Sequence, residues 1–361
     1  MNGKRRLEFL VWIIVLFVGA SCAPRAAKKT DIVWPLPPEA PRVRFVETLR
    51  SNLDVGSGGL ATAIFGEEGG QSLLRPYGVA VDAEGRIYVT DIGRVFVFDK
   101  KNKKLGFIGD EPGTGKLRIP IGITVSRDGK VYVSDTAADR VFVYDSKGSL
   151  LAAFGKEGEF DTPSSVAVDD KRGRLYVSDT KKHNVRAYSL DGNLLSTIGE
   201  RGTAPGKFNN PTNLALDREG NLYVVDTGNF RVQIFDPEGK PVKSIGGAGD
   251  MPGSFARPKG IAIDSEKHIY VVDAAFQNFQ IFNEEGQTLL SVGEGGSAPG
   301  QFQLPAGIFI DDEDRIYVAD GLNSRLQVFE FMGEKWYKRH PEAKRPEESK
   351  PTEPPKPAEK K

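Results

Sequence analysis

The stretch NLYVVDTGNFRVQIFD (221–236) alternates apolar and polar residues on both sides of a small polar turn. Alternation at every second position is typical of a half-buried β-strand, so the stretch predicts two strands joined by a loop. Its pentapeptide LYVVD (222–226) recurs along the chain as IYVTD (87–91), VYVSD (131–135), LYVSD (175–179), IYVVD (269–273) and IYVAD (316–320). The stretch is therefore one copy of a repeated unit.

Each copy is preceded by a segment that begins with proline. These segments are PYGVAVD, PIGITVS, PSSVAVD, PTNLALD, PKGIAID and PAGIFID, starting at Pro76, Pro120, Pro163, Pro211, Pro258 and Pro305. Successive prolines are 44, 43, 48, 47 and 47 residues apart. A period of this size belongs to the blades of β-propellers.

Four strands can be assigned within each unit. The proline segment contains an apolar run without polar alternation, which is typical of an inner strand buried on both faces. The tyrosine-containing strand follows a turn rich in Asp, Glu and Gly, and an alternating third strand such as RVQIFD follows a polar loop. A glycine turn then leads to a fourth strand that ends in Gly, as in LAAFG and VKSIG.

The combined pattern P-x-G-[VI]-A-V-D, [IL]-Y-V-x-D, N-x-R-V-Q-V-F-D and a final G resembles the NHL repeat over about residues 70–332. This resemblance implies an all-β fold, a six-bladed β-propeller of four-stranded antiparallel blades. The chain is also similar to six-bladed NHL-type lipoproteins of the bacterial envelope, which implies a place in envelope assemblies.

The sixth repeat ends at RLQVFEFM (325–332) without a fourth strand, and an open ring would leave an unpaired edge. We expect the N-terminal segment RVRFVETL (42–49) to supply this strand and close the ring, because its apolar residues recur at even spacing. The alternative is KWYKRH (335–340), which is rich in charge and runs into Pro341. The predicted propeller therefore spans residues 41–332.

The first 22 residues resemble a lipoprotein signal peptide. A basic start is followed by the apolar run FLVWIIVLFV (9–18), and Cys22, the single cysteine, comes directly after small residues. We expect lipidation of Cys22 and anchoring in the bacterial envelope; the alternative is an ordinary secretory signal cut near Ala20 or Ala23. Ala23 resembles the sorting pattern for the outer membrane, facing the periplasm or the exterior.

The two flanking segments are expected to lie outside the core. Residues 23–40 are predicted to be a linker, and residues 333–361 a disordered tail rich in Pro, Lys and Glu, because the tail lacks apolar residues that could build a core. Across the chain, 49 basic residues balance 49 acidic ones, so no overall field draws the protein to nucleic acid.

Two recurrent sets of carboxylates invite a catalytic interpretation. One set ends the second strands (Asp91, Asp135, Asp179, Asp226, Asp273 and Asp320) and is followed by the residues that open the third strands (Arg94, Arg140, Asn184, Arg231, Asn278 and Arg325). A catalytic group is needed once, whereas a carboxylate that braces a turn by pairing with Arg is needed in every blade. We therefore expect a structural role and assign no catalytic residue.

The second set ends the inner strands and comprises Asp82, Asp169, Asp217, Asp264 and Asp311, with Ser126 in the remaining blade. These carboxylates are weak candidates for a Ca²⁺ site, but as first residues of turns they would accept main-chain hydrogen bonds instead, and we expect no metal or other cofactor. The chain has three histidines. His183 and His268 belong to turns at opposite ends of the propeller, which excludes a shared zinc ion.

Residues that differ between blades point to a ligand or partner face, since all blades share the demands of the scaffold. The loops after the second strands and those carrying the proline motif should form this face around the channel mouth. The candidates are Tyr77, His183, Thr212, Asn213, Asn229, Phe230, Lys259, Phe276, Gln277 and Phe279. Their phenylalanines are expected either to anchor a partner or to pack into the neighbouring blade.

The sequence thus favours a non-enzymatic, membrane-tethered propeller that binds an envelope protein or a small ligand. Some propellers that the chain resembles are lyases or lactonases, so the alternative is a metal-assisted lyase or lactonase acting at the channel mouth with calcium.

Overall fold

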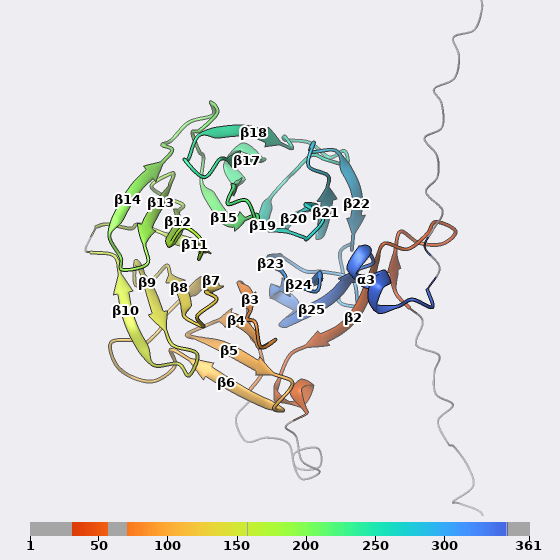
Figure 1. Ribbon diagram of the computed structural model, residues 1–361, viewed down its shortest axis with the longest axis horizontal. Helices are drawn as coiled ribbons and strands as arrows, with labels where there is room; N and C mark the ends of the chain where they lie inside the picture. Colours follow the sequence, from red (N-terminus) through yellow and green to blue (C-terminus); the bar gives the residue numbers. More distant parts are fainter. Residues whose placement is uncertain (1–30, 57–70, 157, 344, 346–361) are drawn as a thin grey trace, which may run out of the picture. The chain divides into compact units, whose positions relative to one another are not determined.

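The computed structural model describes residues 31–56, 71–156, 158–343 and 345. Two units, Met1–Asp31 and Ile32–Lys361, make up the chain. The described part of the second unit forms six antiparallel sheets that follow one another around a central axis (Figure 1). This arrangement confirms the prediction of an all-β, six-bladed propeller.

Each of the first three blades contains four strands in sequence order from the axis outward. Blade one comprises β3 (Val79–Val81), β4 (Ile87–Asp91), β5 (Arg94–Asp99) and β6 (Lys104–Ile108). Blade two comprises β7 (Pro120–Val125), β8 (Val131–Asp135), β9 (Arg140–Tyr144) and β10 (Leu150–Phe154). Blade three comprises β11 (Pro163–Asp169), β12 (Arg174–Asp179), β13 (Asn184–Ser189) and β14 (Leu194–Ile198).

Blades four and five repeat this order, and blade six departs from it at its outer edge. Blade four comprises β15 (Pro211–Leu216), β16 (Leu222–Asp226), β17 (Arg231–Phe235) and β18 (Pro241–Ile245). Blade five comprises β19 (Pro258–Ile263), β20 (Ile269–Asp273), β21 (Asn278–Phe282) and β22 (Thr288–Val292). Blade six comprises β23 (Pro305–Ile310), β24 (Arg315–Asp320), β25 (Arg325–Phe331), β2 (Val43–Leu49) and β1 (Val33–Trp34). Short 3₁₀ turns lie at Asn52–Val55, Thr227–Asn229 and Gly321–Asn323.

The hydrophobic core lies between blades. The buried apolar residues form six clusters, each built from two neighbouring blades, and one of these joins blade six to blade one. The second strands contribute most fully, since every residue of β4, β8, β16 and β20 is buried. The alternating apolar pattern of each blade therefore stabilises the ring through contacts with both neighbours.

The N-terminal strand closes the ring, as predicted. β2 pairs antiparallel with β25 from Val43 opposite Phe331 to Leu49 opposite Leu326. Leu49 is fully buried in the cluster that joins blades six and one. The two ends of the propeller are thus held in one sheet, and the outer edge of β25 is covered.

Two short elements correct the predicted boundaries of the flanking segments. β1 lies inside the predicted linker 23–40 and pairs with β2. Its Trp34 packs edge-on against Phe329, with 5.7 Å between ring centroids. Helix α3 (Glu334–Arg339) lies inside the predicted tail 333–361 and contains all but the last residue of the rival closing segment 335–340. Its Trp336 is buried and gives the helix an apolar contact with the propeller, although the rest of the tail is mostly polar.

The carboxylate of Glu330 on β25 connects these additions to the ring. Its Oε2 accepts hydrogen bonds from Nε of Arg44 at 2.9 Å and from Nε1 of Trp336 at 3.2 Å. Arg44 belongs to β2, and its guanidinium also lies 5.6 Å from the ring centre of Trp336. Glu330 therefore joins the closing strand, the last strand and α3.

The blades have two ends that carry different connections. The loop face is defined here as the end where the proline segments begin and the second strands finish. The turn face is the opposite end, where the inner strands finish in the turns that start with Asp82, Asp169, Asp217, Asp264 and Asp311. Among the described residues, no helix has the length and apolar character to cross a membrane.

Candidate functional site on the loop face

Six buried carboxylates shape the loop face. Asp91 is 3% exposed, and Asp135, Asp179, Asp226, Asp273 and Asp320 are fully buried. Each accepts main-chain N–H bonds from the residues just before the proline of its own blade, as Asp91 does from Leu74 at 2.6 Å and Arg75 at 2.8 Å. These bonds satisfy loop amides and hold each proline segment at the top of its inner strand.

The expected pairing of every such carboxylate with Arg is wrong in four blades. Asp226 pairs with Arg231 at 2.9 Å, and Asp320 pairs with Arg325 at 2.7 Å. In blade one, Arg94 instead lies 3.7 Å from Asp110. Main-chain amides brace the turns in every blade, so the carboxylate does not require a particular side chain opposite it.

The residues on either side of each proline differ from blade to blade. Those before it are Arg75, Ile119, Thr162, Asn210, Arg257 and Leu304, and those after it are Tyr77, Ile121, Ser164, Thr212, Lys259 and Ala306. Blades five, six and one are neighbours in the ring. Their residues after the proline are Lys259, Ala306 and Tyr77, so a small side chain stands between two long ones.

A pocket of about 110 Å³ lies at this place on the loop face. Blade five contributes Arg257, Lys259 and Ala274; blade six contributes Leu304, Pro305, Ala306, Gly321 and Leu322; and blade one contributes Arg75, Pro76 and Tyr77. Three cationic side chains and one phenol thus share a small cavity with leucine and alanine. No Asp or Glu of the described residues lines it. We call this cavity the cationic pocket.

Burial changes the acid–base behaviour of two of these groups. It raises the pKa of Tyr77 to about 12, against the opposing effect of the Arg257 charge, so the phenol stays protonated at neutral pH. Burial also lowers the pKa of Lys259, and the charge of Arg257 lowers it further. Within the described part of the chain, neither the Lys259 ammonium nor the Tyr77 hydroxyl has a hydrogen-bond partner or an ion-pair partner.

Tyr77 and Lys259 are the predicted face residues that the structure brings together in this pocket. His183 lies on the same face at blade three, where its Nδ1 accepts a hydrogen bond from the amide of Asn210 at 3.0 Å. Phe230, Phe276 and Gln277 are half-buried in the loops of blades four and five. Phe230 packs against the cluster between those two blades.

Three other candidates have structural contacts. Phe279 is fully buried in the cluster between blades five and six, so it cannot anchor a partner, and the alternative of packing into the neighbouring blade is correct for it. Asn229 donates to Oδ2 of Asp226 and to the carbonyl of Gly202. Thr212 is buried, with its hydroxyl 2.7 Å from that of Thr227. Phe279 and Thr212 lie in the strands β21 and β15 rather than in loops, and both are buried.

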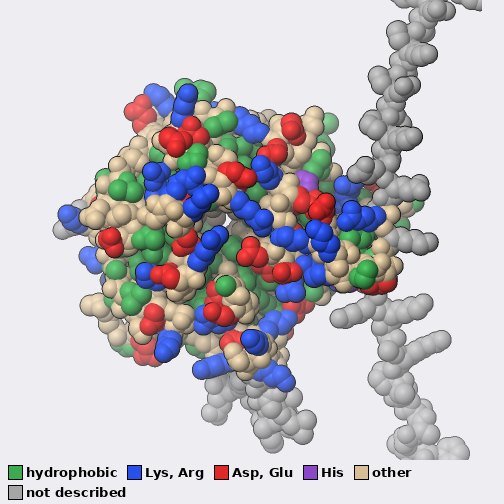
Figure 2. Space-filling view, in the orientation of Figure 1, with side chains coloured by type: hydrophobic (Ala, Val, Ile, Leu, Met, Phe, Trp, Pro, Cys, Tyr) green, Lys and Arg blue, Asp and Glu red, His purple; other side chains and the backbone are tan. Residues whose placement is uncertain are grey.

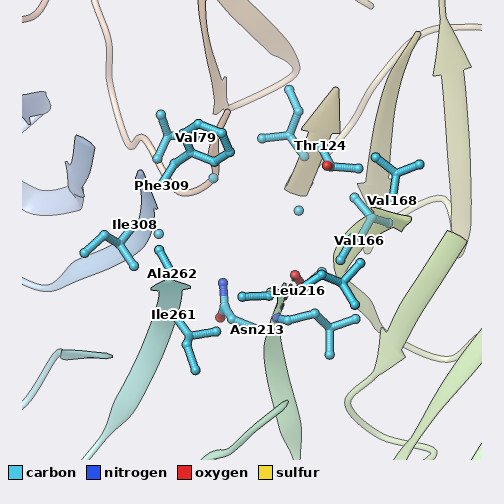
Figure 3. A pocket seen from close by; sticks show the side chains of 18 of the residues that line it. Val79, Thr124, Val166, Val168, Asn213, Leu216, Ile261, Ala262, Ile308 and Phe309 are labelled. Carbon is cyan, nitrogen blue, oxygen red and sulfur yellow. Dashed lines mark hydrogen bonds between the residues drawn. The ribbon is translucent and has the colours of Figure 1, made fainter. Parts of the chain in front are cut away.

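Asn213 faces the central channel instead. The inner strands of all six blades line a cavity of about 270 Å³, whose walls are mostly Val, Ile, Leu and Ala. Among the side chains labelled in Figure 3, only Thr124 and Asn213 are polar. Oδ1 of Asn213 is buried without a hydrogen-bond partner among the described residues. Asn213 stands where four other blades have the glycine of the P-x-G motif.

The turn face has a different character. Figure 2 shows the face that carries α3, where side chains of both charges surround a central depression. This depression, of about 800 Å³, includes Arg127, Lys171, Arg218, Asp170, Asp217 and Asp312. Opposite charges are thus mixed at this mouth of the channel.

The carboxylates proposed as weak Ca²⁺ candidates lie in these turns. Oδ1 of Asp82 accepts the amides of Glu84 and Arg86, and Oδ1 of Asp311 accepts those of Glu313 and Arg315. Asp169, Asp217 and Asp264 also accept amides of their own turns. In the described residues, no three His, Cys, Asp or Glu side chains form a group that could hold a metal ion. Their hydrogen bonds are those expected of turns.

Sequence reasoning missed Arg75, Arg257 and Leu304. Their signal was present in the residue directly before each proline, which varies among Arg, Ile, Thr, Asn and Leu. The predicted histidine separation agrees with the structure, because His183 lies on the loop face and His268 on the turn face. Cys22 and the predicted signal peptide lie outside the described residues.

The closed ring of six antiparallel sheets defines the class of this protein as a six-bladed β-propeller. The profile of DUF5128, described as a 6-bladed beta-propeller, matches residues 116–202, 208–279 and 265–341. Because these matches cover more than half of the chain, the protein belongs to this family. A comparison with curated proteins finds no match.

Several solved structures share the fold at low sequence identity. Virginiamycin B lyase from Staphylococcus aureus is 16% identical, with a TM-score of 0.54 over 71% of this chain and 95% of the lyase. An auxiliary nutrient binding protein from Bacteroides thetaiotaomicron is 13% identical, with a TM-score of 0.57 over 73% of this chain and 71% of that protein. Hydrazine synthase from Kuenenia stuttgartiensis is 12% identical, with a TM-score of 0.52 over 73% of this chain and 97% of that chain.

Proposed function

We propose that this protein is a non-enzymatic binding propeller that recognises an envelope component through its loop face and is held at the membrane by a lipid on Cys22. The observation that carries the proposal is the cationic pocket. Lys259 is a half-buried cation without a partner among the described residues, and it lies beside two further cations. A cation that is partly withdrawn from water without a counter-charge is disfavoured, and a bound anion can supply that counter-charge.

The distribution of shared and individual residues supports this role. The buried carboxylates that hold the loops are common to all six blades, whereas the residues that they place on the surface differ. Leu304 and Leu322 at the pocket are 36% and 54% exposed. An exposed apolar rim around cationic groups is a suitable surface for recognition.

The lyase and the nutrient binding protein that share this fold show that six-bladed propellers serve both chemistry and binding. We favour binding here because the cationic pocket combines a charge that lacks a counter-charge with apolar surface, as a ligand site requires. The mixed charges of the turn face are largely engaged with one another or with main-chain amides.

A pair of matched double variants tests the proposal. Leu304→Asp with Leu322→Asp alters the loop face, and Leu151→Asp with Leu195→Asp alters exposed positions on the outer strands β10 and β14. Both proteins should keep the melting temperature, because all four leucines are exposed. After cross-linking in intact envelopes, the loop-face variant should lose the adducts that the unaltered protein forms, and the outer-strand variant should keep them. Equal adducts in both variants would refute the loop face as the binding surface.

The lipid anchor is tested separately. Cys22→Ser removes the thiol that would be acylated, and acyl chains hold a protein on a bilayer by about 0.8 kcal/mol per buried CH₂. The variant should therefore move from the membrane fraction to the soluble envelope fraction, while Ser21→Ala should remain with the membrane. Continued membrane association of Cys22→Ser would contradict the anchor.

A further inference from the structure

We propose that the cationic pocket binds the carboxylate of a small organic acid, with the apolar part of the acid lying on Leu304 and Leu322. This inference rests on the proposed function and names the chemistry of its ligand. It follows from how three neighbouring blades differ at the same two positions of their repeats.

The space exists because blade six is small where its neighbours are large. Ala306 takes the position after the proline, between Lys259 of blade five and Tyr77 of blade one. The cavity of about 110 Å³ is larger than a single water molecule needs, but it is too small for a bulky ligand. A carboxylate with a short apolar body matches this size.

The charges around the space have one sign. Arg75 and Arg257 occupy equivalent positions before the prolines of blades one and five, so they flank the pocket from two sides. The buried carboxylates Asp91 and Asp273 belong to the same two blades. They accept the main-chain amides of Leu74, Arg75, Ala256 and Arg257, so their charges are directed at the backbone beneath the pocket.

The available donors suit a carboxylate. Lys259 offers an ammonium, and Tyr77 offers a hydroxyl that keeps its proton at neutral pH because its pKa is raised to about 12. A carboxylate accepts hydrogen bonds with both oxygens, and charge-assisted bonds of this kind are stronger than neutral ones. The two arginines add long-range attraction for an anion. Binding would also give Lys259 the counter-charge that the described residues do not provide.

The apolar rim distinguishes an organic acid from an inorganic anion. Leu304, Leu322 and Ala274 line the same cavity as the cations. Burying these surfaces against a hydrocarbon group is favourable by about 25 cal/mol per Å². Phosphate or sulfate would leave that surface in water, so an acid with a short carbon skeleton should bind more tightly than either.

The test is a calorimetric titration of the full-length protein with acetate, isovalerate and benzoate, with their neutral amides, and with phosphate. We expect isovalerate or benzoate to bind more tightly than phosphate, and the amides to show no binding at millimolar concentration. Lys259→Met should weaken carboxylate binding at least tenfold. Ala306→Phe should abolish it by filling the space while all three cations remain.

The control is Lys171→Met, which removes an exposed lysine from the turn face and should leave the affinity unchanged. If Ala306→Phe folds poorly, Lys259→Met still tests the inference, provided that its melting temperature equals that of the unaltered protein. The inference is overturned if no carboxylate binds, if amides or phosphate bind equally well, or if Lys259→Met has no effect. The two proposals can fail separately. If no carboxylate binds but the variant with Leu304→Asp and Leu322→Asp still loses its cross-linked adducts, the proposed function stands and only the ligand class is wrong.

Discussion

Nε of Arg325 donates a hydrogen bond to Oδ2 of Asp320 at 2.7 Å, and the two side chains are 1% and 0% exposed. The same guanidinium also donates to the carbonyls of Ser297, Ala298 and Gln301. All of its nitrogens are therefore occupied, and it fastens the loop between blades five and six to the end of β24. Loop positions around the cationic pocket depend on such buried networks.

Replacing Arg325 with Ala should destabilise the protein by about 3–5 kcal/mol, because it leaves the Asp320 carboxylate buried without its counter-charge. Arg140→Ala is the matched control. Arg140 opens the third strand of blade two but is exposed, so its loss should change the free energy of unfolding by less than about 0.5 kcal/mol. Chemical denaturation measures both values, and equal effects would show that the buried pair contributes nothing.

Phe276 and Phe279 should respond differently to truncation, although they are close in sequence. Phe276 lies in the loop before β21, and Phe279 lies in β21 itself. Phe279→Ala removes a ring that packs against Phe302 and Phe329, and it should cost about 3–5 kcal/mol. Phe276 is half-buried, so Phe276→Ala should cost less than half as much. Urea unfolding midpoints compare the two variants. A small effect of Phe279→Ala would contradict its place in the core.

The closing strand can be tested with two leucines close in sequence. Leu49→Ala should cost about 2–5 kcal/mol, because Leu49 is fully buried between blades six and one. Leu53→Ala should have little effect, since Leu53 is 58% exposed. Calorimetric melting measures the difference between the variants. Similar melting temperatures would indicate that β2 does not hold the ring closed.

His268 should make stability depend on pH. Burial alone would lower the pKa of its imidazole, but the hydrogen bond and charge of Asp264, whose Oδ2 lies 2.8 Å from Nδ1, together with the charge of Glu266, outweigh burial and the opposing charge of Arg42. The net pKa is raised above the ordinary value of 6.5. The protonated ring therefore adds stability that is complete below pH 6.5 and is lost as pH rises through the folded-state pKa.

His268→Gln should accordingly lower the free energy of unfolding more at acidic pH than at alkaline pH. Denaturation at several pH values, from acidic to alkaline, measures the difference in free energy of unfolding between the variant and the unaltered protein. His340→Gln is the control, since the His340 ring stacks on that of Trp336 with 4.3 Å between ring centroids and forms no hydrogen bond with a carboxylate of the described residues. A difference that stays constant with pH would refute the role of the His268 charge.

The fold could be predicted because repetition made a weak local signal strong. A single apolar pentapeptide does not define a blade, but six copies of the repeated unit spaced 43 to 48 residues apart define a ring, and the missing strand of the sixth copy pointed to β2. The short elements β1 and α3 could not be predicted this way. Their tryptophans, Trp34 in contact with Phe329 and Trp336 in contact with Glu330, lie outside the repeat, so no periodic pattern marks them in the sequence.

The site was only partly predictable. Position after the proline identified Tyr77 and Lys259, because loop residues that differ between repeats point to function. The direction of a side chain is not visible in the sequence, so Phe279 and Thr212 were assigned to a surface although they point inward. Arg75 and Arg257 were missed because the buried carboxylates that place them become apparent only from the hydrogen bonds of the loops.

The Glu330 contacts have a mechanical consequence. Val43 at the start of β2 pairs with Phe331 at the end of β25, so the chain enters and leaves this strand pair at the same end. A force applied between these two positions would separate β2 from β25 by unzipping, breaking their hydrogen bonds one after another. It would not shear all of these bonds at once. The Arg44–Glu330–Trp336 contact lies at the end where this separation begins, next to the main-chain bond from Met332 to Arg42, so it is among the first connections that a pulling force would have to break.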